Sequence, residues 1–180
     1  MPSVTRLLDA PAMARSLERI AGEIIEQCGG TKGMVFVGIQ RRGVELAARL
    51  ASLVAKGGTP IPLGKLDITL YRDDLSTVGP APRIGVTSLP DEIEGRTVVI
   101  VDDVLHTGRT IRAALDELAD FGRPRRILLA VLVDRGGREL PIQADFVGLT
   151  VETGPDDRVD VAVQELDRSD SVELVRGGPL

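Results

Sequence analysis

The chain has 180 residues, of which 43% are hydrophobic and 27% charged, and glycine and proline together number 31. This length and composition indicate one globular domain and exclude a disordered, collagen-like or coiled-coil chain. The net charge is −5, and the segment from Glu152 to Leu180 carries eight acidic and three basic side chains, so residues 1–151 are formally neutral. Bulk charge therefore does not indicate a nucleic-acid-binding chain.

The sequence also limits the compartment. No apolar run approaches the roughly 18 residues needed to cross a bilayer, and the first six residues lead into a polar helix instead of a signal sequence. The single cysteine, Cys28, has no partner for a disulfide or a metal site and is expected to be a core thiol. We therefore expect a cytoplasmic protein with no membrane partner.

Apolar spacing predicts the elements of the first half of the chain. A helix is expected from Asp9 to Cys28, with Gly29 and Gly30 at its end, because one face carries Met13, Leu17, Ile20 and Ile24. A strand, Met34–Ile39, then leads through a tight loop into a helix whose inward face is predicted to hold Val44, Ala47, Ala48, Ala51 and Val54. The alternating run Leu66–Tyr71 predicts a half-buried strand, followed by a long loop or hairpin.

The second half continues the alternation of strands and helices. We expect strands at Thr97–Val101 and Ile127–Val133, and a helix from Thr110 that Gly122 caps, with Ile111, Ala114, Leu115 and Leu118 inward. Shorter strands are expected at Phe146–Val151 and Val159–Val163. Uninterrupted apolar strands between helices predict an α/β fold with a mostly parallel sheet flanked by helices. Ligands of such a sheet bind at the carboxyl ends of the strands.

The most informative string runs from Val98 to Thr110. A buried strand delivers two adjacent carboxylates, Asp102 and Asp103, and a loop with two threonines and Gly108 then opens a helix. Backbone N–H groups at a helix start, together with hydroxyls, form a phosphate cradle. The carboxylates would repel that phosphate and suit sugar hydroxyls instead. The string predicts a sugar phosphate ligand; the alternative is an acidic strand end that caps a helix.

This string resembles the 5-phosphoribosyl 1-diphosphate (PRPP) motif of type I phosphoribosyltransferases: four apolar residues, two acids, a short variable stretch and Thr-Gly-x-Thr. Four blocks resemble, in order and spacing, the PyrR family of pyrimidine operon attenuators that are also uracil phosphoribosyltransferases: residues 37–43, 66–75, 101–110 and 129–141. The resemblance covers roughly residues 8–166. It implies one phosphoribosyltransferase domain over 1–180 with a small hood near the termini, a mobile flap over about 66–90 and an acidic C-terminal segment over about 152–180.

The resemblance implies that uracil and PRPP give UMP and diphosphate with Mg²⁺ as cofactor. The residues implied for PRPP binding are Asp102, Asp103, Val104, Leu105, His106, Thr107, Gly108, Arg109 and Thr110. The last four hold the 5-phosphate, while the two carboxylates hold the ribose hydroxyls and orient Mg²⁺ indirectly. His106 is not expected to be a general base, because the family usually has tyrosine there.

Three further loops receive roles from the resemblance. The pyrophosphate loop is Gln40, Arg41, Arg42 and Gly43, although the two arginines alone would also fit a solvated pair. Arg72 and Asp73 belong to the flap that closes over PRPP, whereas Asp74 is expected in a solvated turn. Uracil is framed by Val133, Asp134, Arg135 and Gly136, through loop shape and backbone groups. The alternative for Arg135 and Arg138 is pairing with the acidic flap or a neighbouring subunit.

The family also binds a pyrimidine operon messenger RNA through a basic surface formed in a dimer, so we expect a homodimer or higher homo-oligomer. Candidate RNA-binding residues here are Arg15 and Arg19, with further basic residues at 123–126. Positions that are commonly basic or polar in the family carry Glu18, Gly22, Gln27, Gly137, Gln143 and Leu149. We expect catalysis to be kept and RNA affinity to be reduced or lost.

Two rival functions remain open. The first is a regulator that senses UMP or UTP and binds RNA, with weak or vestigial catalysis; a basic dimer surface would distinguish it. The second is a purine phosphoribosyltransferase, which base preference would distinguish and which the block at 66–75 disfavours.

Overall fold

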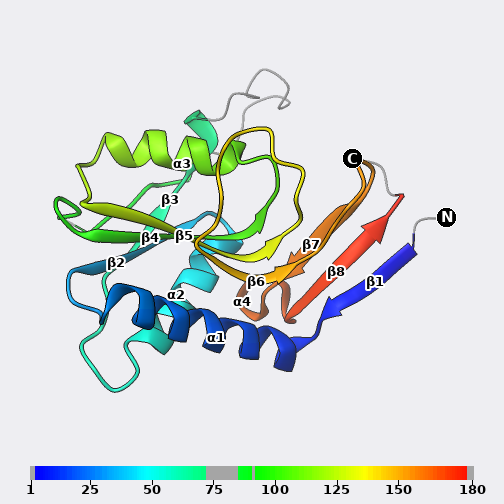
Figure 1. Cartoon of the computed structure of the whole chain (residues 1–180), viewed down its shortest axis with the longest axis horizontal. Coiled ribbons are helices and arrows are strands. Elements are labelled where there is room, and N and C mark those ends of the chain that lie inside the picture. Colours follow the sequence, from blue (N-terminus) through cyan, green and yellow to red (C-terminus); the bar gives the residue numbers. More distant parts are fainter. Residues whose placement is uncertain (1–2, 72–84, 91, 178–180) are drawn as a thin grey trace.

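The computed structural model of the protein describes residues 3–71, 85–90 and 92–177. Its centre is a five-stranded parallel sheet in the order β3-β2-β4-β5-β6 (Figure 1). These strands span Met34–Ile39 (β2), Leu63–Leu66 (β3), Thr97–Leu105 (β4), Arg126–Asp134 (β5) and Phe146–Thr150 (β6). The predicted mostly parallel sheet is confirmed.

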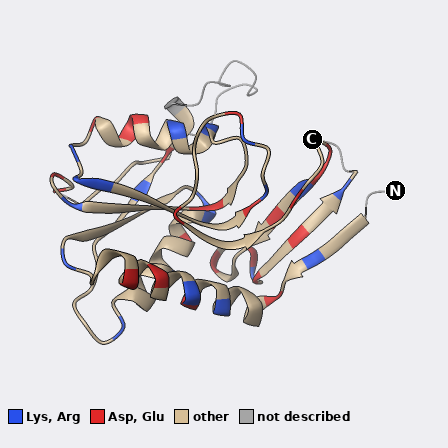
Figure 2. Ribbon diagram, in the orientation of Figure 1, with Lys and Arg blue, Asp and Glu red and all other residues tan. Residues whose placement is uncertain are grey.

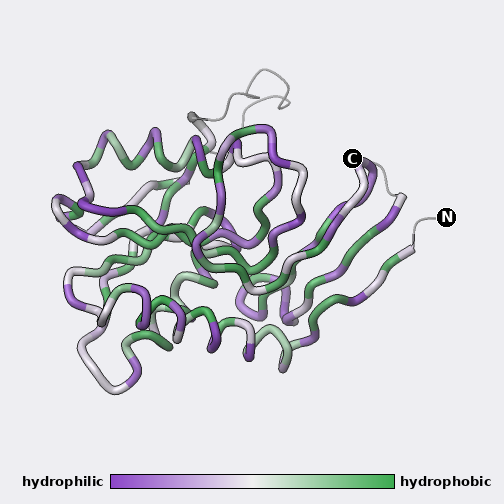
Figure 3. The backbone as a smooth tube through the Cα atoms, in the orientation of Figure 1, coloured by the Kyte–Doolittle hydropathy of each residue, from purple (hydrophilic) through white to green (hydrophobic). Residues whose placement is uncertain are grey.

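Helices cover both faces of this sheet. The helices α1 (Ala10–Cys28) and α2 (Arg42–Val54) lie on one face, and α3 (Arg109–Ala119) lies on the other (Figure 1). Phe36 and Val101 point into the core beneath α1 and α2, whereas Ile100 points into the core beneath α3. Both faces are therefore apolar, which explains the uninterrupted hydrophobic strands (Figure 3). Within the described ranges, no helix is long and apolar enough to cross a membrane.

A second, antiparallel sheet forms the hood at the end of the molecule where both termini lie (Figure 1). Its order is β1-β8-β7, with β1 at Ser3–Leu8, β7 at Arg158–Ala162 and β8 at Ser171–Arg176. The short helix α4 (Gln164–Asp167) joins β7 to β8. Acidic side chains recur along β7, α4 and β8 (Figure 2), so the acidic segment is folded through residue 177.

The predicted bounds of the first helix are confirmed by its caps. The Asp9 carboxylate accepts a hydrogen bond from the Ala12 N–H (2.9 Å), and Gly29 has a left-handed backbone (φ 66°). Cys28, at its end, is half-buried and packs against the core; burial raises the pKa of its thiol.

The strand predicted at Leu66–Tyr71 is wrong. The strand β3 ends at Leu66, and Ile68–Tyr71 form a 3₁₀ helix, η1. The cause is local: the Asp67 carboxylate accepts hydrogen bonds from the N–H (3.0 Å) and hydroxyl of Thr69, which turns the chain out of the extended conformation.

Two details of the helix predictions are also wrong. The helix α3 ends at Ala119 with the right-handed Asp120 at its cap, so Gly122 (φ 151°) lies beyond the cap. On α2, Val44 and Ala48 are only half-buried. The buried face is instead formed by Gly43, Leu46, Ala47, Leu50, Ala51 and Val54.

Glu117 on α3 is an unusual acid, because it is only 3% exposed. One carboxylate oxygen accepts a hydrogen bond from the Thr87 hydroxyl, while Oε2 has no hydrogen-bond partner among the described residues. Burial, reinforced by Asp67 and Asp120, raises the pKa of Glu117 despite the Thr87 hydrogen bond. The ionised form of Glu117 therefore destabilises the native state.

We predict that Glu117→Gln raises the free energy of unfolding at pH 7 by about 1 kcal/mol, because it keeps an acceptor for Thr87 and removes the buried charge. Because the pKa of Glu117 is raised in the native state, the wild-type protein loses stability as the pH rises above the ordinary pKa of glutamate. The advantage of the Glu117→Gln variant should therefore shrink toward pH 4.5. Urea unfolding at both pH values measures this. The exposed Asp116→Asn on the same helix is the control; equal changes in both variants would contradict the prediction.

Candidate active site

The loop after β2 lies against the end of β4. The Gln40–Arg41 peptide bond is cis, and α2 begins at the next residue. A Cβ on Gly43 would lie 2.6 Å from the Val101 carbonyl oxygen and 3.3 Å from the Asp102 Cα. A Cβ on Gly38 would lie 2.4 Å from the Val44 Cα. The two glycines therefore allow the predicted pyrophosphate loop, Gln40–Gly43, to sit directly beside Asp102.

The strand β4 carries the two carboxylates at its carboxyl end. Asp102 is 6% exposed, and its Oδ1 accepts a hydrogen bond from the Asp103 N–H (2.9 Å). Asp103 is half-buried and accepts one from the Val104 N–H (2.9 Å). Burial, followed by the adjacent Asp103 carboxylate, raises the pKa of Asp102 well above its ordinary value. Because burial beside a second carboxylate disfavours its charged form, Asp102 is a candidate functional residue.

The predicted PRPP residues form one continuous strand, loop and helix start. Asp102 to Leu105 end β4, and Arg109 and Thr110 begin α3, with Gly108 (φ 93°) at the cap. The Thr107 hydroxyl accepts a hydrogen bond from the Arg109 N–H (3.3 Å), and the Thr107 carbonyl accepts from Glu139 (3.0 Å) and Leu140 (3.1 Å). The loop after β5 thus folds over the start of α3.

The predicted uracil loop follows β5, beside the PRPP loop. Asp134 pairs with Leu105 in the sheet, and the Arg135 N–H donates to the Leu105 carbonyl (3.0 Å). His106 Nδ1 lies 2.9 Å from the Gly136 carbonyl oxygen. Arg135 is engaged with Thr153 Oγ1 (3.0 Å) and the Asp157 carbonyl (2.7 Å).

Arg138 joins the predicted uracil loop to the predicted PRPP loop. Its guanidinium donates to Asp134 Oδ2 (2.6 Å), to the His106 carbonyl (2.8 Å) and to the Ile142 carbonyl (2.8 Å). Burial alone would raise the pKa of Asp134, but the hydrogen bonds from Arg138 and from the Gly136 N–H outweigh it and lower that pKa. The Asp134 carboxylate is therefore a structural partner, and Arg138 is satisfied within the chain.

A cavity of about 370 Å³ separates this edge of the sheet from the hood. Arg42 and Asp103 line it from the sheet side, and β7, α4 and β8 contribute Asp160, Asp167 and Glu173. The cavity therefore adjoins Arg42 of the predicted pyrophosphate loop and Asp103 of the predicted PRPP motif.

The predicted RNA-binding residues Arg15 and Arg19 lie on α1. Arg15 is exposed on α1. Arg19 donates to Glu23 (3.0 Å) and to the carbonyls of Val147 (3.2 Å) and Gly148 (2.6 Å), which fastens α1 to β6. The flap residues Arg72 and Asp73 fall outside the described residues.

Within the described ranges, no group of three or more His, Cys, Asp or Glu side chains could hold a metal ion. Asp102 and Asp103 alone still fit Mg²⁺, because Mg²⁺ keeps several waters and takes one or two carboxylates together with substrate phosphates.

Comparison with known proteins decides the family. The phosphoribosyl transferase domain family matches residues 3–168. The "Bifunctional protein PyrR" of Chloroflexus aurantiacus is 57% identical over 178 residues, covering 98% of each chain, and that of Thermus thermophilus is 56% identical over 169 residues, covering 93% of each. The chain belongs to the PyrR family of phosphoribosyltransferases.

Solved structures confirm the type I phosphoribosyltransferase fold. A hypoxanthine phosphoribosyltransferase of Staphylococcus aureus has a TM-score of 0.70 at 21% identity, covering 93% of this chain and 90% of that one. The enzyme of Trypanosoma cruzi has a TM-score of 0.73 at 17% identity, covering 96% and 91%. The resemblance to PyrR noted in the sequence is therefore confirmed, together with the fold.

Sequence reasoning missed two side chains near the site, Arg49 and Asp167, and for Arg138 it offered only pairing with the acidic flap or a neighbouring subunit. Arg42 and Arg49 are seven residues apart on α2, so they share a face, and this spacing was a usable signal. The partners of Arg138 and Asp167 come from other elements, and no local spacing reveals them.

We predict that Gly43→Ala lowers the free energy of unfolding by about 1–3 kcal/mol, because the added Cβ meets the Val101 carbonyl and must displace the loop or β4. Gly22→Ala is the control: nothing lies within 4 Å of its Cβ, and alanine should stabilise α1 by about 0.5–1 kcal/mol. Denaturant unfolding of both variants measures this, and a neutral Gly43→Ala would contradict the close approach.

Proposed function

We propose that the protein transfers the phosphoribosyl group of PRPP to uracil, forming UMP and diphosphate. The observation that carries this proposal is the meeting, at one edge of the sheet, of the three segments predicted to bind ligands: Gln40–Gly43, Asp102–Thr110 and Val133–Gly136. The PyrR relatives, at 52–57% identity, support it.

In this proposal each segment binds one part of PRPP. The 5-phosphate binds the start of α3, where the Thr107 and Thr110 hydroxyls add to the backbone N–H groups. Asp102 and Asp103 accept hydrogen bonds from the ribose hydroxyls. Arg41, Arg42 and the amides of their loop stabilise the negative charge that develops on departing diphosphate while C1′ becomes oxocarbenium-like.

Mg²⁺ is proposed to enter with PRPP and, when bound, to supply positive charge to the leaving diphosphate. Asp102 and Asp103 would orient it from the ribose side. Arg72 and Asp73 are proposed to exclude water from above the same diphosphate. Uracil binds against Val133–Gly136, where Arg138 and the internal bonds of Asp134 and Arg135 fix the loop shape.

The direct test measures UMP formation from PRPP and uracil with and without Mg²⁺, with hypoxanthine, guanine and orotate in parallel reactions. We expect turnover with uracil alone, lost on chelation of Mg²⁺. Turnover with a purine would favour the purine enzyme. No turnover with any base would favour a UMP- or UTP-sensing regulator with vestigial catalysis.

We predict that Asp102→Asn raises thermal stability while it lowers kcat/KM by at least about 100-fold. The native state loses an acid that burial disfavours, and the ribose loses a charged acceptor. Thermal unfolding without ligands and steady-state kinetics measure the two effects. A variant that is less stable and fully active would contradict both roles.

A role in RNA-dependent attenuation follows from the family, and we propose that RNA affinity is reduced in this chain. The Arg19 guanidinium is engaged by Glu23 and the β6 backbone, and Glu18 beside it repels phosphate. Arg15 remains exposed.

Binding of a pyrimidine-leader hairpin at physiological salt, measured by gel shift, tests the reduced affinity. We expect no better than micromolar affinity with weak sequence preference; specific nanomolar binding would overturn the proposal. Self-association as a homodimer or larger homo-oligomer and a cytoplasmic location are proposed with it, and sedimentation analysis tests the first.

A further inference from the structure

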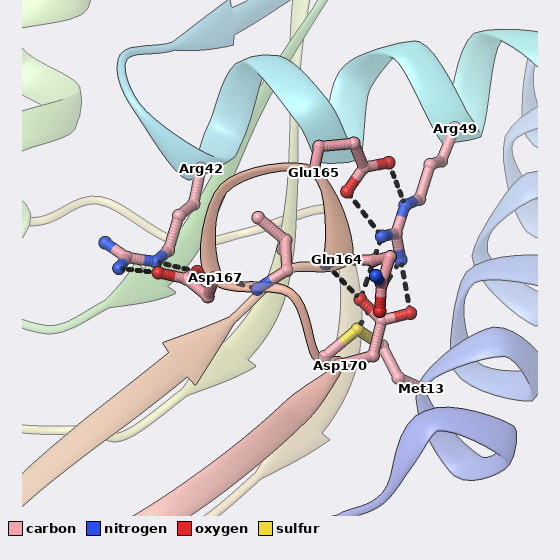
Figure 4. A network of polar contacts seen from close by, with 8 residues as sticks. Met13, Arg42, Arg49, Gln164, Glu165, Asp167 and Asp170 are labelled. Carbon is pink, nitrogen blue, oxygen red and sulfur yellow. Dashed lines mark hydrogen bonds and ion pairs between the residues drawn. The ribbon is translucent and has the colours of Figure 1, made fainter.

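Arg42, in the pyrophosphate loop, is held by a carboxylate of the hood (Figure 4). Arg42 Nε donates to Asp167 Oδ2 (3.1 Å), and Arg42 Nη2 donates to Asp167 Oδ1 (2.8 Å). Asp167 Oδ2 also accepts from the Val163 N–H (2.8 Å), so the carboxylate is itself fixed. The hydrogen bond between the two side chains raises the pKa of Arg42 and lowers the pKa of Asp167.

A second ion-pair cluster fastens the same hood segment to the same helix. Arg49 lies two turns after Arg42 on α2 and donates to both oxygens of Glu165 (2.9 and 2.6 Å) and of Asp170 (3.0 and 2.8 Å) (Figure 4). Asp170 in turn accepts from the Gln164 N–H (2.7 Å). The position of Asp167 is therefore set by α2, independently of its own contact with Arg42.

The pairing leaves one edge of the Arg42 guanidinium available. A bidentate contact through Nε and Nη2 uses one side of the planar group, and Nη1 makes no hydrogen bond among the described residues. The Arg42 side chain is 36% exposed, and it lines the cavity that it shares with Asp103. A second anion can therefore bind the free edge without displacing Asp167.

We propose that Asp167 is a positioning residue that holds Arg42 ready for the diphosphate half of PRPP. The inference rests on the proposed function, in which Arg42 contacts diphosphate. An arginine that is already ordered loses less rotamer freedom when the ligand binds. Three more carboxylates line the cavity: Asp103, Asp160, which pairs with Arg158, and Glu173, which pairs with Arg6. We expect the ordering of Arg42 to outweigh their repulsion of a second anion, because the cavity is open to solvent, which screens them.

The test measures equilibrium binding by calorimetry, with the full chain and Mg²⁺, for diphosphate and for ribose 5-phosphate separately. Asp167→Asn should weaken diphosphate binding about 3–10-fold and leave ribose 5-phosphate binding within twofold. Glu165→Gln is the matched control, because it removes an ion pair between α4 and α2 without touching Arg42; both ligands should stay within twofold. Asp167→Glu should recover part of the loss.

Kinetics give an independent readout. Asp167→Asn should lower kcat/KM for PRPP about 3–10-fold, with a fall in kcat as well as a rise in the KM for PRPP, because Arg42 acts on charge that develops during the reaction. The KM for uracil should change less than twofold, a pattern that general loosening of the hood would not give. Diphosphate binding that is unchanged or tighter in Asp167→Asn, or equally weakened in Glu165→Gln, overturns the inference.

Arg42→Gln distinguishes a failure of the positioning role of Asp167 from a failure of the proposed contact between Arg42 and diphosphate. If Arg42→Gln does not weaken diphosphate binding, the proposed role of the loop fails, and the role of Asp167 fails with it. If Arg42→Gln weakens diphosphate binding and Asp167→Asn does not, only the positioning role is lost.

Discussion

The close approach of α2 to the end of β4 is the constraint on which the site depends. Because Gly43 has no side chain, its Cα packs against the Val101 carbonyl, and the loop that begins α2 is brought beside Asp102. The parallel register of β4 and β5 then places the loop after β5 against the same edge. The segments predicted to bind sugar, phosphate and base thereby meet at one edge of the sheet, although each is short.

The acids of the candidate site and those of the hood lie in different electrostatic surroundings. Asp102 is buried beside a second carboxylate, an arrangement that the unliganded fold tolerates only at a cost. The acids of the C-terminal segment do the reverse: Glu165, Asp167 and Asp170 each pair with an arginine of α2. The hood is thus joined by ion pairs to the helix that begins in the predicted pyrophosphate loop.

Much of this was predictable from the sequence, because the signals are local. Apolar periodicity predicted the central strands, and the string Val98–Thr110 predicted the strand, loop and helix start that the structure shows there. The strand predicted at Leu66–Tyr71 failed because Asp67 bonds to Thr69, a competing turn that alternation does not reveal. The roles of Arg138 and Asp167 depend on partners brought by tertiary contacts, and no motif records them.

In the proposed function, three loops at one edge of the sheet bind the parts of a single nucleotide. A crystal structure of the protein with UMP would show whether they do. We expect the 5-phosphate at Thr107–Thr110, the ribose hydroxyls on Asp102 and Asp103, and the uracil ring against Val133–Gly136. A phosphate bound away from the start of α3, or a ribose out of reach of both carboxylates, would contradict it.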